Sequence, residues 1–205
     1  MIFPAHSNLR FSAAQFGNPK GKAFILRHTR TATFINLKEQ KMAGQVRTRI
    51  QLVAEMLENY ARRGVFRGFS QGPVRQGKAT FKLLWHRDQT FELKYDAQKN
   101  TLRFPLVLPN VPAASAMYQE LKQFIAAQHA DELPEHRRID SRRTQIRPSN
   151  RGGNVALTAK VVNGDCEYGT RKLIHLTHEI FLTFLLDGKY FDYLVETFDL
   201  DPDKM

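Results

Sequence analysis

Hydrophobic and polar residues follow one another along this chain in blocks whose period changes from helical to extended and back. In the first block, apolar side chains recur every three or four residues from 46 to 60, and charged side chains fill the positions between them. The apolar positions are Val46, Ile50, Val53, Leu57 and Tyr60. Gly64 follows and is placed to end the helix. The pattern predicts an amphipathic helix of about five turns.

Strict alternation replaces the helical period between residues 80 and 107, where three short segments place an apolar residue at every second position. The apolar sets are Phe81, Leu83 and Trp85; Phe91, Leu93 and Tyr95; and Leu102, Phe104 and Leu106. They predict a three-stranded antiparallel meander with one apolar and one charged face. Pro105 has no amide proton for the ladder, so the third strand is expected to be an edge strand or to carry a bulge there.

A second helix and two more strands are predicted after the meander. Ser115 is placed to cap a helix whose apolar side comprises Met117, Leu121, Phe124 and Ile125. Residues 130–153 are polar and rich in arginine, and they predict a long, mobile basic loop. The alternating residues of the next strand are Val155, Leu157, Ala159 and Val161. Asn163-Gly164 then predicts a tight turn into a short strand at residues 165–168.

Two helices are expected at the C-terminal end, at residues 171–186 and 190–198, with Gly188 between them. On a helical wheel, the apolar residues of the first of these helices share one broad face. The residues on the opposite side are Arg171, Lys172, His175 and Glu179, and His178 lies at the border. Leu182 and Leu186 also fall on the side of His175 and Glu179, away from the core. Because two leucines on a polar side need cover, these four residues predict a homodimer contact.

The predicted order is helix, three strands, helix, two strands, helix, which is a single α+β domain over residues 42–205. Its antiparallel sheet is expected to carry the helices on one face. This order, together with the apolar sets at residues 81–85 and 155–159, is similar to the type III secretion chaperone-like fold over about residues 46–200. The resemblance implies a small α+β dimer that binds segments of other proteins. It assigns no functional residue, and this chain is basic where the secretion chaperones are usually acidic.

Residues 1–41 show no clear periodicity and contain seven basic residues against one acidic residue. We expect an unstructured basic leader or an upstream start assigned in error, because Met42 stands directly before the first patterned helix. The acid-poor composition is also that of an organellar targeting segment, and a structured element is the third alternative.

The chain carries 31 lysines and arginines against 20 acidic residues, a net charge of +11. Residues 1–112 hold the excess, and residues 113–205 carry a net charge of −2. Such an excess of positive charge favours phosphate-bearing partners. The candidate nucleic-acid-binding residues are Arg137, Arg138, Arg142, Arg143, Arg147 and Arg151 in the basic loop, with Arg67, Arg75 and Lys78 in a glycine-rich connection.

Two motifs suggest chemistry but depart from the pattern that the chemistry needs. Gly72 to Ala79 is close to a phosphate-binding loop, but Ala79 replaces the magnesium-binding hydroxyl and a strand pattern follows it. His175, His178 and Glu179 are close to a zinc protease motif, but the histidines are three residues apart and the glutamate follows the second. The single cysteine, Cys166, excludes an intrachain disulfide and a cysteine-based zinc site.

No apolar run reaches the roughly 20 residues that a membrane span requires. The sequence thus favours a non-enzymatic, chaperone- or adaptor-like protein that binds another protein or protein segment. We expect it to bind no membrane and to need no cofactor or metal. It is expected in the cytoplasm, or in an organelle if residues 1–41 are a targeting segment. RNA or other polyanion binding through the arginine-rich loop is the alternative function. A metal-dependent hydrolase is the remote alternative.

Overall fold

The computed structural model describes residues 22–201. The chain divides into two units, Met1–Met42 and Ala43–Met205, and the fold described below is that of the second unit. The first helix, α1, spans Lys22–Arg62 and belongs to both units, so it begins about twenty residues before the predicted start of the domain. Residues 1–21, the rest of the predicted leader, lie outside the described part of the chain.

Six strands form one antiparallel sheet in the order β1-β2-β3-β4-β6-β5. Their bounds are β1 Gly68–Gln71, β2 Lys78–Leu84, β3 Thr90–Asp96, β4 Thr101–Leu108, β5 Thr144–Arg151 and β6 Asn154–Val161. Strands β1 to β4 follow one another as a meander, and β6 lies between β4 and the edge strand β5. The predicted α+β class with an antiparallel sheet is confirmed.

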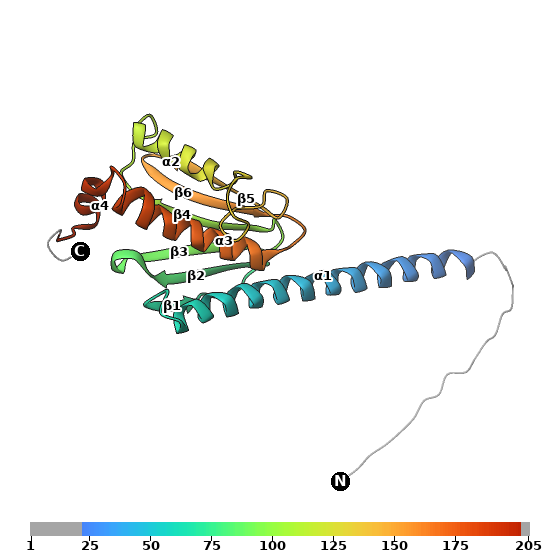
Figure 1. Cartoon of the computed structure of the whole chain (residues 1–205). Helices are drawn as coiled ribbons and strands as arrows, with labels where there is room; N and C mark the ends of the chain where they lie inside the picture. Colours follow the sequence, from blue (N-terminus) through green and yellow to red (C-terminus); the bar gives the residue numbers. More distant parts are fainter. Residues whose placement is uncertain (1–21, 202–205) are drawn as a thin grey trace, which may run out of the picture. The chain divides into compact units, whose positions relative to one another are not determined.

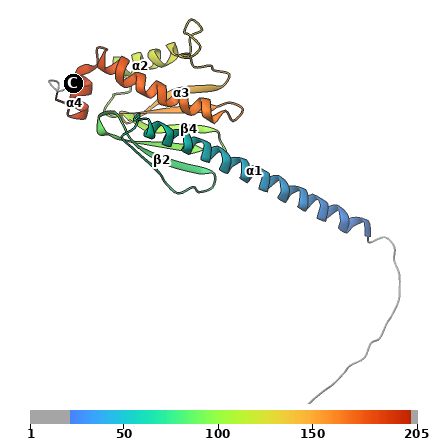
Figure 2. The same cartoon turned by 60° about the horizontal axis from the view of Figure 1, so that its bottom comes forward.

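The helices of the domain lie on one face of the sheet, as predicted (Figures 1 and 2). They are the part of α1 from Ala43 onward and α2 Ala116–Ala127, α3 Cys166–Glu179 and α4 Phe191–Phe198. A π-helical segment, η2 Ile180–Leu186, continues α3, and the short 3₁₀ turn η1 His86–Asp88 joins β2 to β3. Within residues 22–201, no helix combines the length and the apolar character needed to cross a membrane.

The hydrophobic core lies between the sheet and these helices, and its residues are those that the alternation pattern singled out. Phe81, Leu83, Leu93 and Leu157 are fully buried on the covered face of the sheet. Leu106 is the exception among the predicted strand residues, since 45% of it is exposed. The register of β4 against β6 shifts between Phe104 and Leu108, so the irregularity expected at Pro105 is a bulge inside the sheet.

Two strands were not predicted. Strand β5 occupies the second half of the segment expected to be a mobile loop at residues 130–153, and Gly152 and Gly153, both with positive φ, form its turn into β6. Its sequence holds one isoleucine among polar residues, because an edge strand exposes most of its side chains. Strand β1 is only four residues long, and it lies in the glycine-rich connection, where no alternation of apolar residues indicates a strand.

The short strand expected at residues 165–168 does not exist, because Asp165 caps a helix instead. Its side chain accepts a hydrogen bond from the backbone N–H of Tyr168 at 3.2 Å, which satisfies one of the free donors at the start of α3. The Asn163-Gly164 turn therefore leads from β6 into α3. Ser115 caps α2 in the same way, as predicted.

Candidate cationic pocket at Tyr168

The residues predicted to bind nucleic acid fall at opposite edges of the sheet. Arg67 precedes β1 and Arg75 lies in the β1–β2 turn, whereas residues 137–151 lead into β5 and form it. Five inter-strand spacings, about 24 Å, separate these two edge strands. Arg67 and Lys78 are each ion-paired with an aspartate. The structure therefore does not bring the nine residues to one place.

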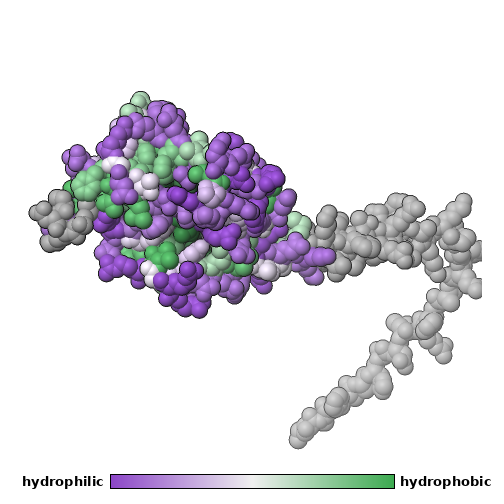
Figure 3. Space-filling view, in the orientation of Figure 1, coloured by the Kyte–Doolittle hydropathy of each residue, from purple (hydrophilic) through white to green (hydrophobic). Residues whose placement is uncertain are grey.

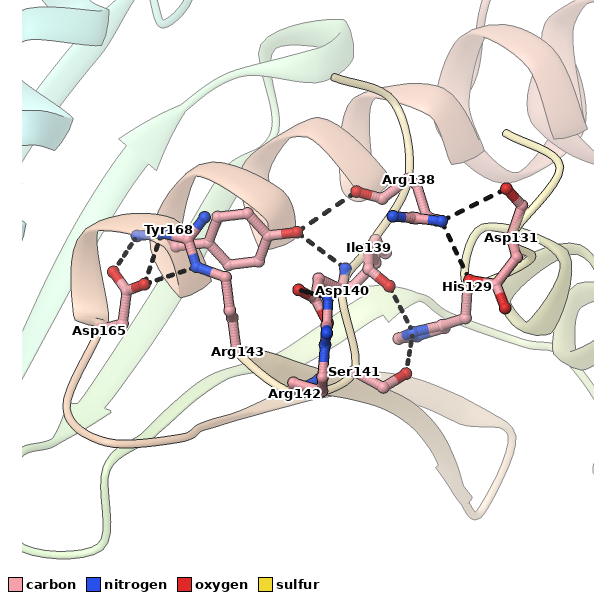
Figure 4. Close-up of polar contacts among 10 residues, drawn as sticks. All are labelled: His129, Asp131, Arg138, Ile139, Asp140, Ser141, Arg142, Arg143, Asp165 and Tyr168. Carbon is pink, nitrogen blue, oxygen red and sulfur yellow. Dashed lines mark hydrogen bonds and ion pairs between the residues drawn. The ribbon is translucent and has the colours of Figure 1, made fainter. Parts of the chain in front are cut away.

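Three arginines in the first half of the arginine-rich segment are ion-paired with aspartates, and one of these pairs, Arg143 with Asp165, ties the segment to the start of α3 (Figure 4). The pairs are Arg138 with Asp131 at 3.0 Å, Arg142 with Asp140 at 3.1 Å and Arg143 with Asp165 at 2.6 Å. Hydrogen bonds from Arg142 hold the pKa of the Asp140 carboxyl below its usual range. Ile139 is buried in the same stretch and joins the core. This segment is thus an ordered part of the domain, packed on its core.

Tyr168, in the first turn of α3, contacts the arginine-rich segment through both its hydroxyl and its ring (Figure 4). Its hydroxyl accepts a hydrogen bond from the backbone N–H of Asp140 at 2.8 Å and donates one to the carbonyl of Arg138 at 3.3 Å. The Arg143 guanidinium lies 3.9 Å from the centre of the ring, within cation–π range. Arg171 and Lys172 approach the same ring at 5.5 Å.

A pocket of about 450 Å³ opens between this segment and the start of α3. Its lining residues are Glu135, His136, Arg138, Asp140, Arg142, Arg143, Tyr168, Arg171 and Lys172. Five of the nine are cationic and two are acidic. Hydrophilic residues also dominate the surface over the N-terminal half of α3 and the loop beside it, whereas hydrophobic groups show nearer α4 (Figure 3).

Lys172 is the unusual member of this pocket, because only 4% of its surface is exposed. Its ammonium donates one hydrogen bond, to the carbonyl of His136 at 2.9 Å, and forms no ion pair within the described residues. Burial lowers the pKa of Lys172, and the neighbouring Arg171 and Arg143 lower it further. A buried cation among other cations attracts an anion with several acceptor oxygens, which can take up the remaining N–H donors.

Sequence reasoning missed Tyr168 and assigned Lys172 to the polar side of its helix. The helical wheel was correct in placing Lys172 away from the main core. The residue is nevertheless buried because the segment at residues 135–143 packs over that side of α3, a contact between positions some thirty residues apart. Helical periodicity carries no information about which other segment packs over a given side of the helix.

The residues of the remote hydrolase alternative point to different partners. His175 Nε2 lies 3.6 Å from the Glu179 carboxylate, at the surface, and burial lowers the pKa of His175. His178 instead shares a hydrogen bond with His86, with 3.3 Å between Nδ1 and Nε2, and stacks on Trp85. In the part of the chain that the structure describes, no group of three or more His, Cys, Asp or Glu side chains could hold a metal ion.

The four residues of the predicted dimer contact lie along α3 and η2. Leu182 is 38% exposed and His175 is exposed, whereas Glu179 is partly buried and accepts a hydrogen bond from Thr183. Leu186 is partly buried and packs against the core. The reason for expecting cover thus applies to Leu182 alone, and single exposed leucines are ordinary on protein surfaces.

The glycine-rich connection resembling a phosphate-binding loop is a hairpin turn. Arg75 and Lys78 exchange backbone hydrogen bonds at 2.9 and 3.0 Å across Gln76 and Gly77, both of which have positive φ. Strand β2 follows directly, so no helix N-terminus is present here to cradle a phosphate.

Comparison of the chain with protein-family models, with curated proteins and with solved structures gives no match.

Proposed function

We propose that this protein is a non-enzymatic binding protein and that the Tyr168 pocket takes a phosphate group of its ligand. The observation that carries the proposal is the buried Lys172, which lines the pocket with one hydrogen bond and no carboxylate partner among the described residues. This observation supports the alternative of polyanion binding more than it supports the binding of another protein.

The distribution of ion pairs around the pocket supports an anionic ligand. Arg138, Arg142 and Arg143 are each neutralised by an aspartate, so their main effect is to fix the walls. Arg171 and Lys172 form no ion pair in the described chain and supply the attraction. A buried charge is costly without a partner, and a phosphate oxygen would recover that cost.

The size of the pocket supports a ligand larger than a phosphate ion. A volume of about 450 Å³ falls in the range of small-molecule sites, which runs from roughly 300 to 1,000 Å³. Three cationic groups lie within 5.5 Å of the centre of the Tyr168 ring, so the surroundings of the ring favour a polar ligand. The ligand is therefore a phosphate attached to a further polar group, such as a sugar phosphate or one unit of a polymer.

Thermal unfolding in sodium phosphate, compared with sodium chloride of equal ionic strength, tests the proposal. A ligand at a hundred times its Kd stabilises the native state by about 2.7 kcal/mol, which corresponds to a rise in Tm of roughly 5–10 °C for a protein of this size. We expect this rise for the native chain and its loss in Lys172→Met. Lys122→Met is the matched control, because Lys122 also lies over a tyrosine ring, that of Tyr118 at 5.3 Å, but outside the pocket.

An equal rise in phosphate and in chloride would refute the proposal, as would an undiminished phosphate effect in Lys172→Met. Isothermal titration with inorganic phosphate gives a second readout that does not depend on Tm. It covers the case in which Lys172→Met alters the stability of the free protein.

Protein binding through a homodimer is the second candidate function. The exposed Leu182, with His175 exposed about two turns before it, supports a small contact on η2. Sedimentation of the native chain and of Leu182→Glu tests it: a dimer that becomes a monomer in the variant is the expected result. A native chain that sediments as a monomer at micromolar concentration contradicts it.

A further inference from the structure

The face of the sheet opposite the helices is a second cationic surface, separate from the Tyr168 pocket. In the described residues no helix packs on it (Figures 1 and 2). The alternating burial along the strands places every second side chain on this face. The exposed cations on this open face include Lys78, Lys82, Lys94, Arg103, Arg147 and Lys160. They come from all five strands between β2 and the β5 edge.

The strand register aligns three of these cations in a row across the sheet. Lys94 pairs with Arg103, Arg103 pairs with Thr158, and Thr158 pairs with Arg147. The row crosses β3, β4, β6 and β5, so it is about 14 Å long. Like charges directly opposite each other destabilise a sheet, so Lys94 beside Arg103 is a cost that folding alone does not explain.

Carboxylates compensate little of this charge. Glu92 lies 3.1 Å from Lys94 on the same strand. Lys78 lies 3.7 Å from Asp96 on the neighbouring strand. No ion pair with a described residue is formed by Lys82, Arg103, Arg147 or Lys160, and Arg103 instead donates a hydrogen bond to Thr158 at 2.9 Å. A face on which four cations spread over four strands have no carboxylate partner is complementary to a polymer of phosphates rather than to a single anion.

The open face offers no aromatic side chain from β2, β3 or β4 on which bases could stack. The aromatic residues of β2, β3 and β4 all point to the covered face, where Phe81, Phe91, Tyr95 and Phe104 are buried in the core. Stacking on aromatic rings, which binds the bases of single strands, is therefore not available here. A six-stranded sheet is also too broad for a major groove, which admits a helix or a two-stranded ribbon.

We infer that the open face binds the sugar–phosphate backbone of double-stranded nucleic acid without reading its sequence. Arg103, Arg147 and Lys160 contact phosphates, with Lys82 beside them on β2. This inference does not rest on the Tyr168 pocket, because none of these residues lines it.

The test measures binding of the full chain to a labelled 20-base-pair DNA duplex as a function of salt. With four unpaired cations the slope of log K against log salt is expected near −3.6, a loss of about 150-fold in affinity between 50 and 200 mM salt. The variant Arg103→Gln/Arg147→Gln/Lys160→Gln should reduce the slope to about −1. All three side chains are exposed, so the variant should remain folded.

The matched control is Arg47→Gln/Arg62→Gln/Arg63→Gln, which removes the same charge from exposed positions on α1 and directly after its last residue. We expect it to keep most of the affinity and the slope. Equal losses in the two triple variants would show that net charge alone is responsible and would overturn the inference. Absence of duplex binding at 50 mM salt, or a strong preference between two duplexes of different sequence, would also overturn it.

Lys172→Met separates this inference from the proposed function. It should leave duplex binding intact while abolishing the phosphate-dependent rise in Tm. If it abolishes duplex binding instead, the pocket and not the open face is the nucleic-acid site, and the inference fails while the proposed function stands.

Discussion

Lowering the pH should destabilise this protein mainly through the imidazole of His86, in the β2–β3 turn, whose pKa is shifted furthest among the described histidines. His86 is partly buried, stacks on Phe181 with ring centres 4.4 Å apart and shares a hydrogen bond with His178. Burial, the adjacent His178 and Arg87 together lower the pKa of His86 from 6.5 to about 3. The folded protein therefore keeps this ring neutral at pH values where the unfolded chain protonates it.

The sign and size of the effect follow from this difference in pKa. Stability contributed by the neutral ring is complete above pH 6.5 and is lost as the pH falls towards 3, because the unfolded state binds the proton first. Between pH 7 and pH 5 the loss is about 2 kcal/mol, and between pH 7 and pH 3 it approaches ~4.5 kcal/mol. For a domain of this size, about 2 kcal/mol lowers Tm by roughly 4–8 °C.

Urea unfolding at pH 7 and at pH 5 measures this effect, with the fluorescence of Trp85, the single tryptophan, as the probe. His86→Phe keeps a ring against Phe181 but cannot be protonated, so the variant should lose about 2 kcal/mol less than the native chain over this range. His136→Gln removes an exposed imidazole and is the control. If native chain and His86→Phe lose the same stability between the two pH values, the reasoning is wrong.

The remaining predictions concern packing. Gly169→Ala should lower the free energy of unfolding by roughly 1–3 kcal/mol, because its Cβ would lie 2.6 Å from Val161 Cγ2 in the core. Gly44→Ala makes the same change on an open side of α1 and should instead raise the free energy of unfolding by roughly 0.5–1 kcal/mol. Urea unfolding measures both variants, and a change of the same sign in the two free energies would contradict this prediction. The Cys166 thiol is buried, and burial raises its pKa. It should therefore react with a disulfide reagent only as fast as the native domain opens, and fast labelling of the native protein would disprove this.

The alternation of apolar residues determined most of the sheet and its core. Positions such as Phe81, Leu93 and Leu157 fixed which strands exist and which face of each is buried, because a strand places every second side chain on the same side. Ser115 likewise determined where α2 begins, since a helix cap is a local hydrogen bond.

Tertiary contacts decided the strand β5 and both candidate surfaces. Thr144 to Arg151 has too few apolar residues to signal a strand, and it becomes one because β6 offers a complete ladder of backbone partners. Lys172 is a surface residue by helical periodicity and a buried cation only when residues 135–143 fold over it. The row of Lys94, Arg103 and Arg147 exists only through the strand order, which joins residues far apart in the sequence. Local patterns report the period of one segment, whereas a site requires knowing which segments meet.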